Sequence, residues 1–244
     1  MTENQRVAIV TGGSRGIGRA VAERLAADGQ AVVVGYAGNQ AAAEAAVETI
    51  GKAGGRAVAV RADVAEPAAV GALFDTAEQR YGGVDVVVNA AGIMILSPLA
   101  ELDLDALDRM HRTNIRGTFV VAREAAGRVR AGGAIINFST SVTRLHLPAY
   151  SAYAASKAAV EAISPILAKE LRGRDITVNA VAPGPTATAL FLDGKSDQQI
   201  QQIAGQNPMQ RLGRPEDIAE VVSTLAGPAR WINGQTVYVN GGAA

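Results

Sequence analysis

A tyrosine and a lysine in one alanine-rich stretch have the types and the spacing for acid/base chemistry. Tyr153 and Lys157 lie four residues apart in SAYAASKAAVEAISPILAKEL, which predicts a helix, and residues at this spacing share one helix face. A free phenol, with a pKa of about 10, exchanges protons poorly at neutral pH, whereas a nearby ammonium stabilises the phenolate and lowers that pKa. The pair is therefore a candidate general acid/base, although the same spacing is common on an ordinary, partly exposed helix face.

The stretch TGGSRGIG at residues 11–18 fits two unrelated chemical motifs. One is G-x-S-x-G, which would expose Ser14 as a nucleophile, but that motif needs a histidine later in the chain, and His111 and His146 are the only two. The other is a glycine turn between a strand, RVAIV, and a helix that ends at Gly29. Strand, glycine turn and helix are the context of a dinucleotide site, where the helix N-terminus offers N–H groups to phosphate. We favour the nucleotide hypothesis.

The elements that must position these residues follow from the pattern of apolar runs. Alanine-rich periodic stretches predict helices at residues 19–27, 40–53, 68–81 and 154–172. Val- and Ile-rich runs predict seven strands, at residues 7–10, 32–34, 58–60, 84–88, 135–138, 177–181 and 236–239. Strands that are apolar at nearly every position need helices on both faces. We therefore predict an α/β Rossmann fold, a single doubly wound domain over residues 1–244 with a seven-stranded parallel sheet.

Composition excludes several classes of partner. The 23 basic and 23 acidic residues cancel, so there is no basic field to attract nucleic acid or an anionic membrane. Cysteine is absent, and no His and carboxylate groups have metal-ligand spacing, so we expect no metal. No apolar run approaches the roughly 18 residues of a membrane span. We expect a soluble, cytoplasmic protein.

One long stretch interrupts the alternation of strands and helices. Residues 183–215 mix Gly, Pro, Thr and Gln around a short helical pattern, and loops of this length in compact domains are usually functional lids or disordered. We expect a substrate lid at about 185–214. Its apolar surface would come from Leu190, Phe191, Leu192 and Met209, and the pocket rim from His146 and Tyr150.

Further motifs occur in a fixed order along nearly the whole chain. After the TGxxxGxG turn come Asp63-Val64, Asn89-Ala90-Ala91-Gly92, Asn114, Tyr153-x3-Lys157 and Pro183-Gly184. In this order the motifs resemble those of the short-chain dehydrogenase/reductase family, and the overall pattern is most similar to its 3-oxoacyl-carrier-protein reductase-like branch. The resemblance implies an oxidoreductase that interconverts a carbonyl and a secondary alcohol, assembled as a homotetramer.

The cofactor expected from the sequence is NADP(H). An NAD enzyme needs a carboxylate at the end of the second strand, but Tyr36 stands there and no carboxylate lies between Gly29 and Glu44. Arg15 lies where the family's NADP-dependent members often carry a basic residue, and a guanidinium suits a 2′-phosphate. By resemblance Asp63 contacts the adenine, although it could equally cap the following helix. The cofactor-binding residues we expect are Gly12, Ser14, Arg15, Gly16, Ile17, Gly18, Tyr36, Asn39, Asp63, Val64, Asn89, Ala90, Ala91, Gly92, Tyr153, Lys157, Pro183, Gly184, Thr186 and Thr188.

The resemblance also implies catalytic roles. Tyr153 would protonate the carbonyl oxygen during hydride transfer, Lys157 would also bind the nicotinamide ribose, and Asn114 would hold a water that links Lys157 to solvent. The family's serine usually lies thirteen positions before the tyrosine, where this chain has Thr140. A threonine hydroxyl has the same donor and acceptor capacity, so we predict Thr140 for this role, with Ser141 as the alternative.

Two other activities remain open from the sequence. Arg130 and Arg174 lie near the positions of the carrier-docking arginines in the 3-oxoacyl-carrier-protein reductase branch, which gives weak support for an acyl-carrier substrate. The competing enzyme hypothesis is reduction of a small ketone, quinone or sugar carbonyl. A third hypothesis is a regulator that binds NADP(H) without turnover.

Overall fold

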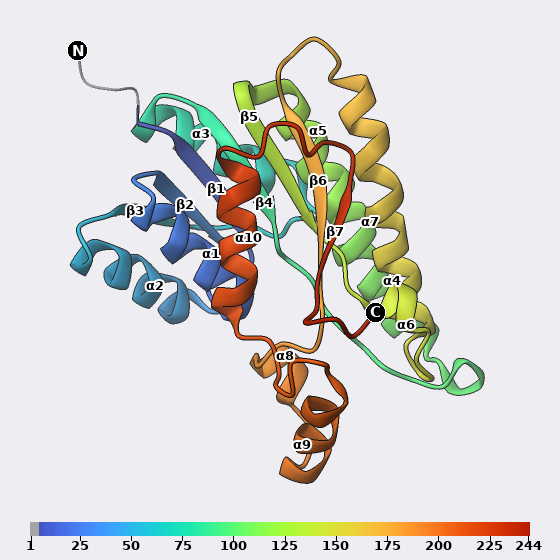
Figure 1. Ribbon diagram of the computed structural model, residues 1–244. Helices are drawn as coiled ribbons and strands as arrows, with labels where there is room; N and C mark the ends of the chain where they lie inside the picture. Colours follow the sequence, from blue (N-terminus) through green and yellow to red (C-terminus); the bar gives the residue numbers. More distant parts are fainter. Residues whose placement is uncertain (1–4) are drawn as a thin grey trace.

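A seven-stranded parallel sheet forms the centre of the protein, whose computed structural model describes residues 5–244 (Figure 1). The strand order is β3-β2-β1-β4-β5-β6-β7. The strands are β1 (Val7–Thr11), β2 (Ala31–Tyr36), β3 (Arg56–Arg61), β4 (Val84–Asn89), β5 (Val129–Phe138), β6 (Thr177–Pro183) and β7 (Thr236–Val239). The principal helices are α1 (Gly16–Ala27), α2 (Gln40–Lys52), α3 (Pro67–Tyr81), α4 (Leu104–His111), α5 (Gly117–Arg128), α7 (Ser151–Glu170) and α10 (Pro215–Ala226). Short helical elements are η1 (Leu99–Glu101), η2 (Arg112–Arg116), α6 (Val142–Leu145), α8 (Ala189–Leu192) and α9 (Asp197–Gln206).

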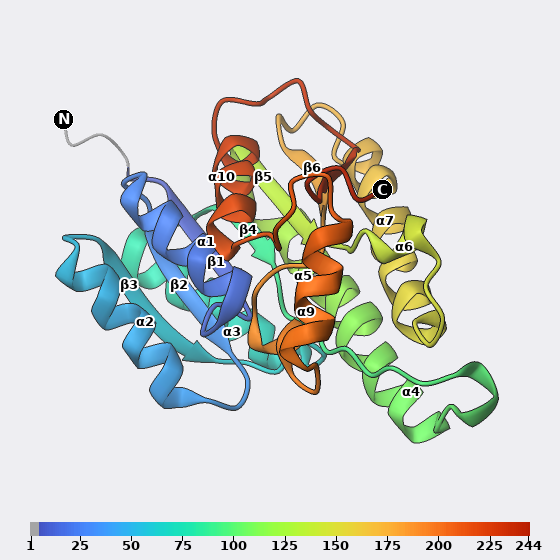
Figure 2. The ribbon, with the colours of Figure 1, turned by 60° about the horizontal axis from the view of Figure 1, so that its bottom comes forward.

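Helices cover both faces of the sheet, as the apolar strands require (Figure 2). Every residue of β1, β2 and β4 is buried, so neither face of these strands meets solvent. Helices α1, α2 and α10 pack on one face, and α3, α5 and α7 pack on the other. The predicted doubly wound Rossmann fold is confirmed.

Helix α7 and strand β5 both begin earlier than predicted. Helix α7 begins at Ser151, ahead of the predicted residue 154, because the N–H of Ala154 already bonds to the carbonyl of Tyr150. Strand β5 begins at Val129, well before the predicted residue 135. Its first part pairs with β4 across a register shift, a bulge that an apolar pattern does not reveal.

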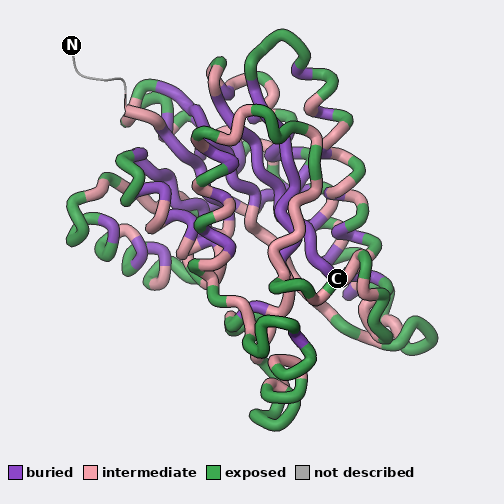
Figure 3. Tube along the Cα trace, in the orientation of Figure 1, coloured by how far each residue is buried: buried purple, intermediate pink, exposed green. Residues whose placement is uncertain are grey.

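The strand order reverses beside β1, which pairs with both β2 and β4. Connections from these strands leave toward opposite faces, which opens a crevice at their carboxyl ends. Helices α8 and α9 project beyond this edge and contain no buried residue (Figure 3). In the described part of the chain, no helix has the length and apolar character needed to cross a bilayer.

Candidate active site

A cleft of about 590 Å³ lies at the carboxyl ends of β1, β4, β5 and β6. Nearly all the catalytic and cofactor-binding residues expected from the sequence line it, although they come from segments far apart in the chain. The exceptions are Asn89 and Asn114, which lie beneath its floor and are fully engaged with other protein groups. The fold therefore brings the glycine turn and the Tyr153/Lys157 pair to a single site.

The glycine turn is shaped to bring backbone close to a ligand. Gly12 and Gly16 have φ values of 65° and 52°, a region that favours glycine. A Cβ on Gly18 would lie 2.3 Å from the carbonyl oxygen of Gly12, so the turn packs directly on the first turn of α1. This geometry fits a pyrophosphate at a helix N-terminus. The nucleophile hypothesis for Ser14 lacks a partner, since neither histidine is among the described residues that line the cleft.

At the end of the cleft near β2 and β3, Asp63 is held by two partners. Its carboxylate accepts from the N–H of Ala65 at 2.9 Å and from the Arg112 guanidinium at 2.8 Å. Burial acts to raise the pKa of Asp63, but these two donors outweigh it and hold the pKa below its ordinary value. Asp63 is therefore ionised at neutral pH. Asp63 closes a turn ahead of α3 and does not cap that helix, whose N-cap residue is Glu66, and it lines the cleft where the adenine contact is expected.

Two guanidinium groups flank the same end without a carboxylate partner. Arg15 lines the cleft beside Tyr36, and Arg61 donates from Nε to the carbonyl of Ala37 at 3.1 Å. Among the described residues, neither arginine forms an ion pair. The side chain of Asn39, also at the cleft, caps α2 by accepting from the N–H of Ala42 at 2.9 Å. This end thus carries uncompensated positive charge suited to a dianion.

At the other end, Tyr153 and Lys157 are buried on one face of α7. Burial raises the pKa of Tyr153 to about 12, and the nearby Thr140 hydroxyl opposes that rise. Burial also lowers the pKa of Lys157 to about 8. The Lys157 ammonium donates to the carbonyl of Phe138 at 2.8 Å and lies 6.0 Å from the centre of the Tyr153 ring.

This geometry corrects the expectation that Lys157 lowers the pKa of Tyr153. The ammonium is directed to a backbone carbonyl, and the removal of water from around the phenol dominates its pKa. Tyr153 therefore holds its proton at neutral pH and is a proton donor rather than a phenolate.

Three consecutive hydroxyls after β5 point to three different partners. Ser139 donates to the Glu161 carboxylate at 2.6 Å, and Ser141 donates to the carbonyl of Ala182 at 3.2 Å. The Thr140 hydroxyl accepts only at 3.4 Å from the N–H of Val142, and it lies near enough to Tyr153 to oppose the rise of the phenol's pKa. The side chains of Ser139 and Ser141 are thus occupied by the scaffold, which leaves Thr140 facing the phenol.

Asn114 lies in η2, a π-helical turn, and its side chain holds the floor of the cleft. Its Oδ1 accepts from the N–H of Ile93 at 2.9 Å, and its Nδ2 donates to the Ile93 carbonyl at 2.9 Å and to Ser156 Oγ at 3.0 Å. A Cβ on Gly92 would lie 3.3 Å from both Asn114 Oδ1 and Lys157 Nζ. Asn114 therefore fixes the loop after β4 against α7, and its expected part in holding a water near Lys157 stays a prediction.

Asn89 also supports the cleft from below. Its Oδ1 accepts from the Thr11 hydroxyl at 2.8 Å, and its Nδ2 donates to Thr118 Oγ1 at 3.1 Å. Its side chain joins the ends of β1 and β4 to α5, and the contact of this segment with the cofactor stays a prediction.

Comparison with known proteins agrees with this geometry. A family model described as Enoyl-(Acyl carrier protein) reductase matches residues 12–244. A "Short-chain type dehydrogenase/reductase" from Picea abies is 48% identical, with 97% of this chain and 92% of that protein covered. The chain belongs to the short-chain dehydrogenase/reductase family.

Two further members of the family are similar over nearly their whole length. "NADPH-dependent aldehyde reductase 2, chloroplastic" from Arabidopsis thaliana is 45% identical over 97% of this chain and 93% of its own. The crystal structure of a short-chain dehydrogenase from Burkholderia cenocepacia in complex with NADP is 39% identical, with a TM-score of 0.91 and coverage of 99% of this chain and 98% of that one.

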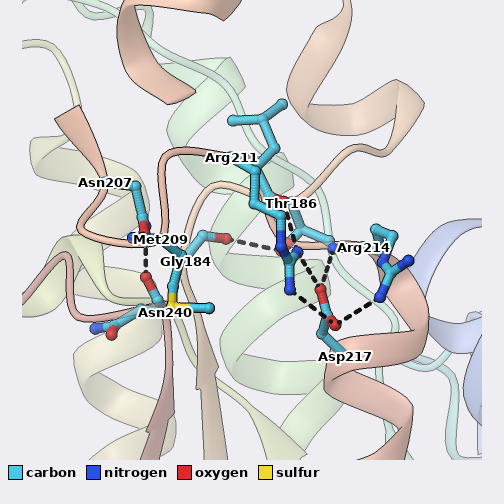
Figure 4. Close-up of polar contacts among 9 residues, drawn as sticks. Gly184, Thr186, Asn207, Met209, Arg211, Arg214, Asp217 and Asn240 are labelled. Atoms are coloured by element: carbon cyan, nitrogen blue, oxygen red, sulfur yellow. Dashed lines mark hydrogen bonds and ion pairs between the residues drawn. The ribbon is translucent and has the colours of Figure 1, made fainter. Parts of the chain in front are cut away.

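The segment predicted as the lid of this dehydrogenase/reductase is tied down at its base (Figure 4). Thr186 and Gly213 form a parallel bridge where the segment leaves and rejoins the sheet edge. Asn207 donates to the carbonyl of Asn240 at 2.7 Å, which anchors the return of the chain after α9. The segment that contains α8 and α9 is thus anchored to the rest of the protein at both of its ends.

An ion cluster holds the end of this segment to α10. The Asp217 carboxylate accepts from Arg211 at 2.6 Å and from the backbone N–H of Arg214 at 2.7 Å. The hydrogen bond from Arg211 is the main reason that the pKa of Asp217 falls to about 2. The base of the segment therefore keeps its charges at any pH near neutrality.

The apolar residues expected in the lid divide into two pairs. Leu190 and Phe191 line the cleft, whereas Leu192 and Met209 do not. Met209 is 60% exposed, and its backbone N–H donates to Asn207 Oδ1 at 2.8 Å. The expectation for Leu192 and Met209 is therefore wrong for this conformation.

The rim of the cleft contains apolar residues that no sequence motif indicated. Tyr150 lines it as expected, but His146 does not, because Leu145 and Leu147 on either side of it occupy the rim. Ile93 and Met94 add to the same apolar wall. The signal for these two was the apolar run IMIL directly after Gly92.

Arg130 and Arg174 lie near the amino ends of β5 and β6, whereas the cleft lies at the carboxyl ends of the strands. Arg130 donates to the Asp85 carboxylate at 2.9 Å near the amino end of β5, and Arg174 donates to the Ala126 carbonyl. Neither lines the cleft of its own chain, so the chain itself does not present them at the site as the acyl-carrier hypothesis would suggest.

Proposed function

We propose that this family member is an NADP(H)-dependent oxidoreductase that interconverts a carbonyl and a secondary alcohol. The observation that carries the proposal is the meeting of Tyr153, Lys157 and the glycine turn in one cleft. Three observations support the choice of cofactor. Position 36 is a tyrosine and not a carboxylate, and Arg15 supplies a cation at the cleft. One relative is named as NADPH-dependent, and another was crystallised in complex with NADP.

The backbone of the glycine turn and the start of α1 would hold the pyrophosphate, and the residues around Arg15 the adenosine end. When bound, NADPH supplies a hydride to the carbonyl carbon. Tyr153 then gives its phenolic proton to the carbonyl oxygen, so that an alcohol forms. Its raised pKa keeps the phenol protonated at neutral pH, so Tyr153 carries the proton that reduction consumes.

Thr140 and Lys157 would assist that proton transfer. The Thr140 hydroxyl, facing Tyr153, can donate to the same carbonyl oxygen as charge develops on it. Lys157 remains largely protonated at neutral pH with a pKa of about 8, and its ammonium places a positive charge beneath the site. In the oxidative direction Tyr153 accepts the proton from the alcohol.

The cleft favours a small apolar substrate over an acyl-carrier thioester. The cleft is lined by apolar side chains, among them Ile93, Met94, Leu147, Leu190 and Phe191. An aldehyde or ketone with an aliphatic or aromatic substituent suits such a wall, and one relative is named as an NADPH-dependent aldehyde reductase.

A panel of carbonyl compounds monitored by NADPH absorbance tests the proposal. We expect turnover of small apolar aldehydes or ketones with NADPH, and much weaker turnover with NADH. Turnover restricted to acyl-carrier thioesters would identify the carrier reductase. Tight NADPH binding without turnover of any substrate would identify the regulator and defeat the enzyme proposal.

We also propose the homotetramer that the family resemblance implies. Three exposed apolar side chains, Phe119 on α5, Ile166 on α7 and Trp231 before β7, lie on surfaces where subunits would meet. Trp231 is 100% exposed in the single chain. Light scattering that gives the mass of one chain would refute the assembly.

A further inference from the structure

A half-buried carboxylate that the proposed mechanism does not use lies beside the catalytic hydroxyls. Glu161 is one helical turn after Lys157 on α7, where an ion pair between the two would be the simplest expectation. Instead Lys157 donates to the Phe138 carbonyl, and no Lys157–Glu161 ion pair occurs in the described residues. The charge of Glu161 is therefore available for other groups.

Three hydroxyls from two segments, the turn after β5 and strand β7, converge on this carboxylate. Glu161 Oε1 lies 2.6 Å from Ser139 Oγ, 2.9 Å from Thr143 Oγ1 and 3.4 Å from the Tyr238 hydroxyl. Hydroxyls that donate to an ionised acceptor make stronger bonds than neutral pairs do. The carboxylate thus joins the turn after β5 and strand β7 to helix α7.

The two closest donors bracket Thr140 in the chain. Ser139 precedes it directly, and the Thr143 hydroxyl also lies 2.9 Å from the carbonyl of Thr140 itself. The contacts to Glu161 therefore fix the backbone on both sides of the hydroxyl that faces Tyr153. A displacement of about 1 Å in such a group is enough to lower a reaction rate strongly.

We propose that Glu161 is a positioning residue that holds Thr140 in register with Tyr153. The inference rests on the proposed function, in which Thr140 donates to the substrate oxygen. Glu161 does not line the cleft, and it acts on Thr140 through the turn at residues 139–143.

The test is a double-mutant cycle in the full-length protein, with kcat and the KM for NADPH measured for each variant. We expect Glu161→Ala to lower kcat about tenfold with an unchanged KM for NADPH. In a Thr140→Ala background the same change should cost less than about twofold, because coupled residues give non-additive effects. Glu161→Gln, which keeps an acceptor oxygen, should restore most of kcat.

Two controls separate positioning from general damage. Glu170→Ala removes the same charge from the exposed end of α7 and should leave kcat unchanged. Hydrogen exchange of the peptide that covers residues 139–145 should rise in Glu161→Ala but not in Glu170→Ala. Equal losses with and without Thr140, or unchanged exchange, would overturn the Glu161 role while the enzyme proposal stands. A wild-type protein that reduces no carbonyl would overturn both.

Discussion

The two ends of the cleft are built differently. Around Tyr153 the polar side chains are buried, and Asn114, Ser139, Ser141 and Lys157 each have a protein partner within hydrogen-bonding distance. The other end, around Arg15, presents guanidinium groups toward solvent without a carboxylate partner.

The difference predicts two kinds of response to mutation. A buried polar group that loses its partner costs roughly 1–3 kcal/mol, so the Tyr153 end should be intolerant and should report on turnover. Exposed charges are screened by water and salt, so the Arg15 end should report on ligand affinity with little effect on folding.

The largest effect is expected from Tyr153→Phe. The change removes the proton donor but keeps the ring, so kcat should fall by about a thousandfold while NADPH affinity stays within about twofold. Stopped-flow turnover and fluorescence titration of NADPH measure the two quantities. Retained turnover would refute Tyr153 as the acid and remove the basis of the comparison.

Next in size is the loss of the hydroxyl that faces the phenol. Thr140→Ala should lower kcat about a hundredfold, as expected when a donor to a developing oxyanion is removed. Ser141→Ala, whose hydroxyl donates to the Ala182 carbonyl, should lower kcat by less than about fivefold. The opposite order of the two variants in a kcat comparison would assign the role to Ser141.

The buried ammonium should be visible in stability as a function of pH. Burial lowers the pKa of Lys157 from 10.5 to about 8, so between these values the folded protein has released a proton that the unfolded chain retains. The unfolded state then binds more protons, and stability rises with pH by about 1.4 kcal/mol per unit above pH 8.

Urea unfolding at pH 7 and at pH 9.5 measures this gain. The wild type should gain about 2 kcal/mol relative to Lys157→Met, which lacks the titrating group. The opposing effect of Tyr153, whose raised pKa favours the folded state until pH rises through about 10 to 12, begins above this window. Parallel pH profiles for the two proteins would show that Lys157 is not desolvated.

At the other end, Arg15→Ala should weaken NADPH binding about tenfold and leave NADH binding unchanged. The lost contact is a charge-assisted one to the 2′-phosphate, worth roughly 1.5 kcal/mol. Calorimetric titration with both cofactors at low and high salt measures it, and the gap between wild type and variant should narrow at high salt. Equal losses for NADH and NADPH would contradict this role.

The smallest effect is expected from Arg61→Ala, about threefold on NADPH affinity. Arg61 adds charge near the Ala37 loop but is exposed, so solvent screening limits its contribution. Arg56→Ala is the matched control, because it removes the same charge from the other end of β3, where the side chain stacks on Tyr81. Equal losses of NADPH affinity in the two variants would indicate that Arg61 acts through the overall electrostatic field of the protein and not through a local contact.

Much of the architecture could be predicted because secondary structure depends on local patterns of apolar residues and glycines in the sequence. Fully apolar runs such as β1 indicate strands covered on both faces, and the turn Gly12 to Gly18 between a strand and a helix indicates a phosphate site. The four-residue spacing of Tyr153 and Lys157 places both on one helix face. Each of these signals depends on covalent neighbours alone.

The partners of individual side chains could not be predicted in this way. His146, Leu192 and Met209 were expected around the substrate, but the local course of the loops leaves them outside the cleft. The Asp63–Arg112 pair joins residues 49 positions apart, and nothing in either segment signals the other.

The sequence by itself determined the fold class, the family and which short segments had to meet. Only the tertiary structure decided that Lys157 donates to a backbone carbonyl, that Thr140 rather than its neighbours faces the phenol, and that the pKa of Tyr153 rises instead of falling. The physical reason is that secondary structure follows from the periodicity of neighbouring residues, whereas desolvation and hydrogen-bond partners depend on which distant segments pack together.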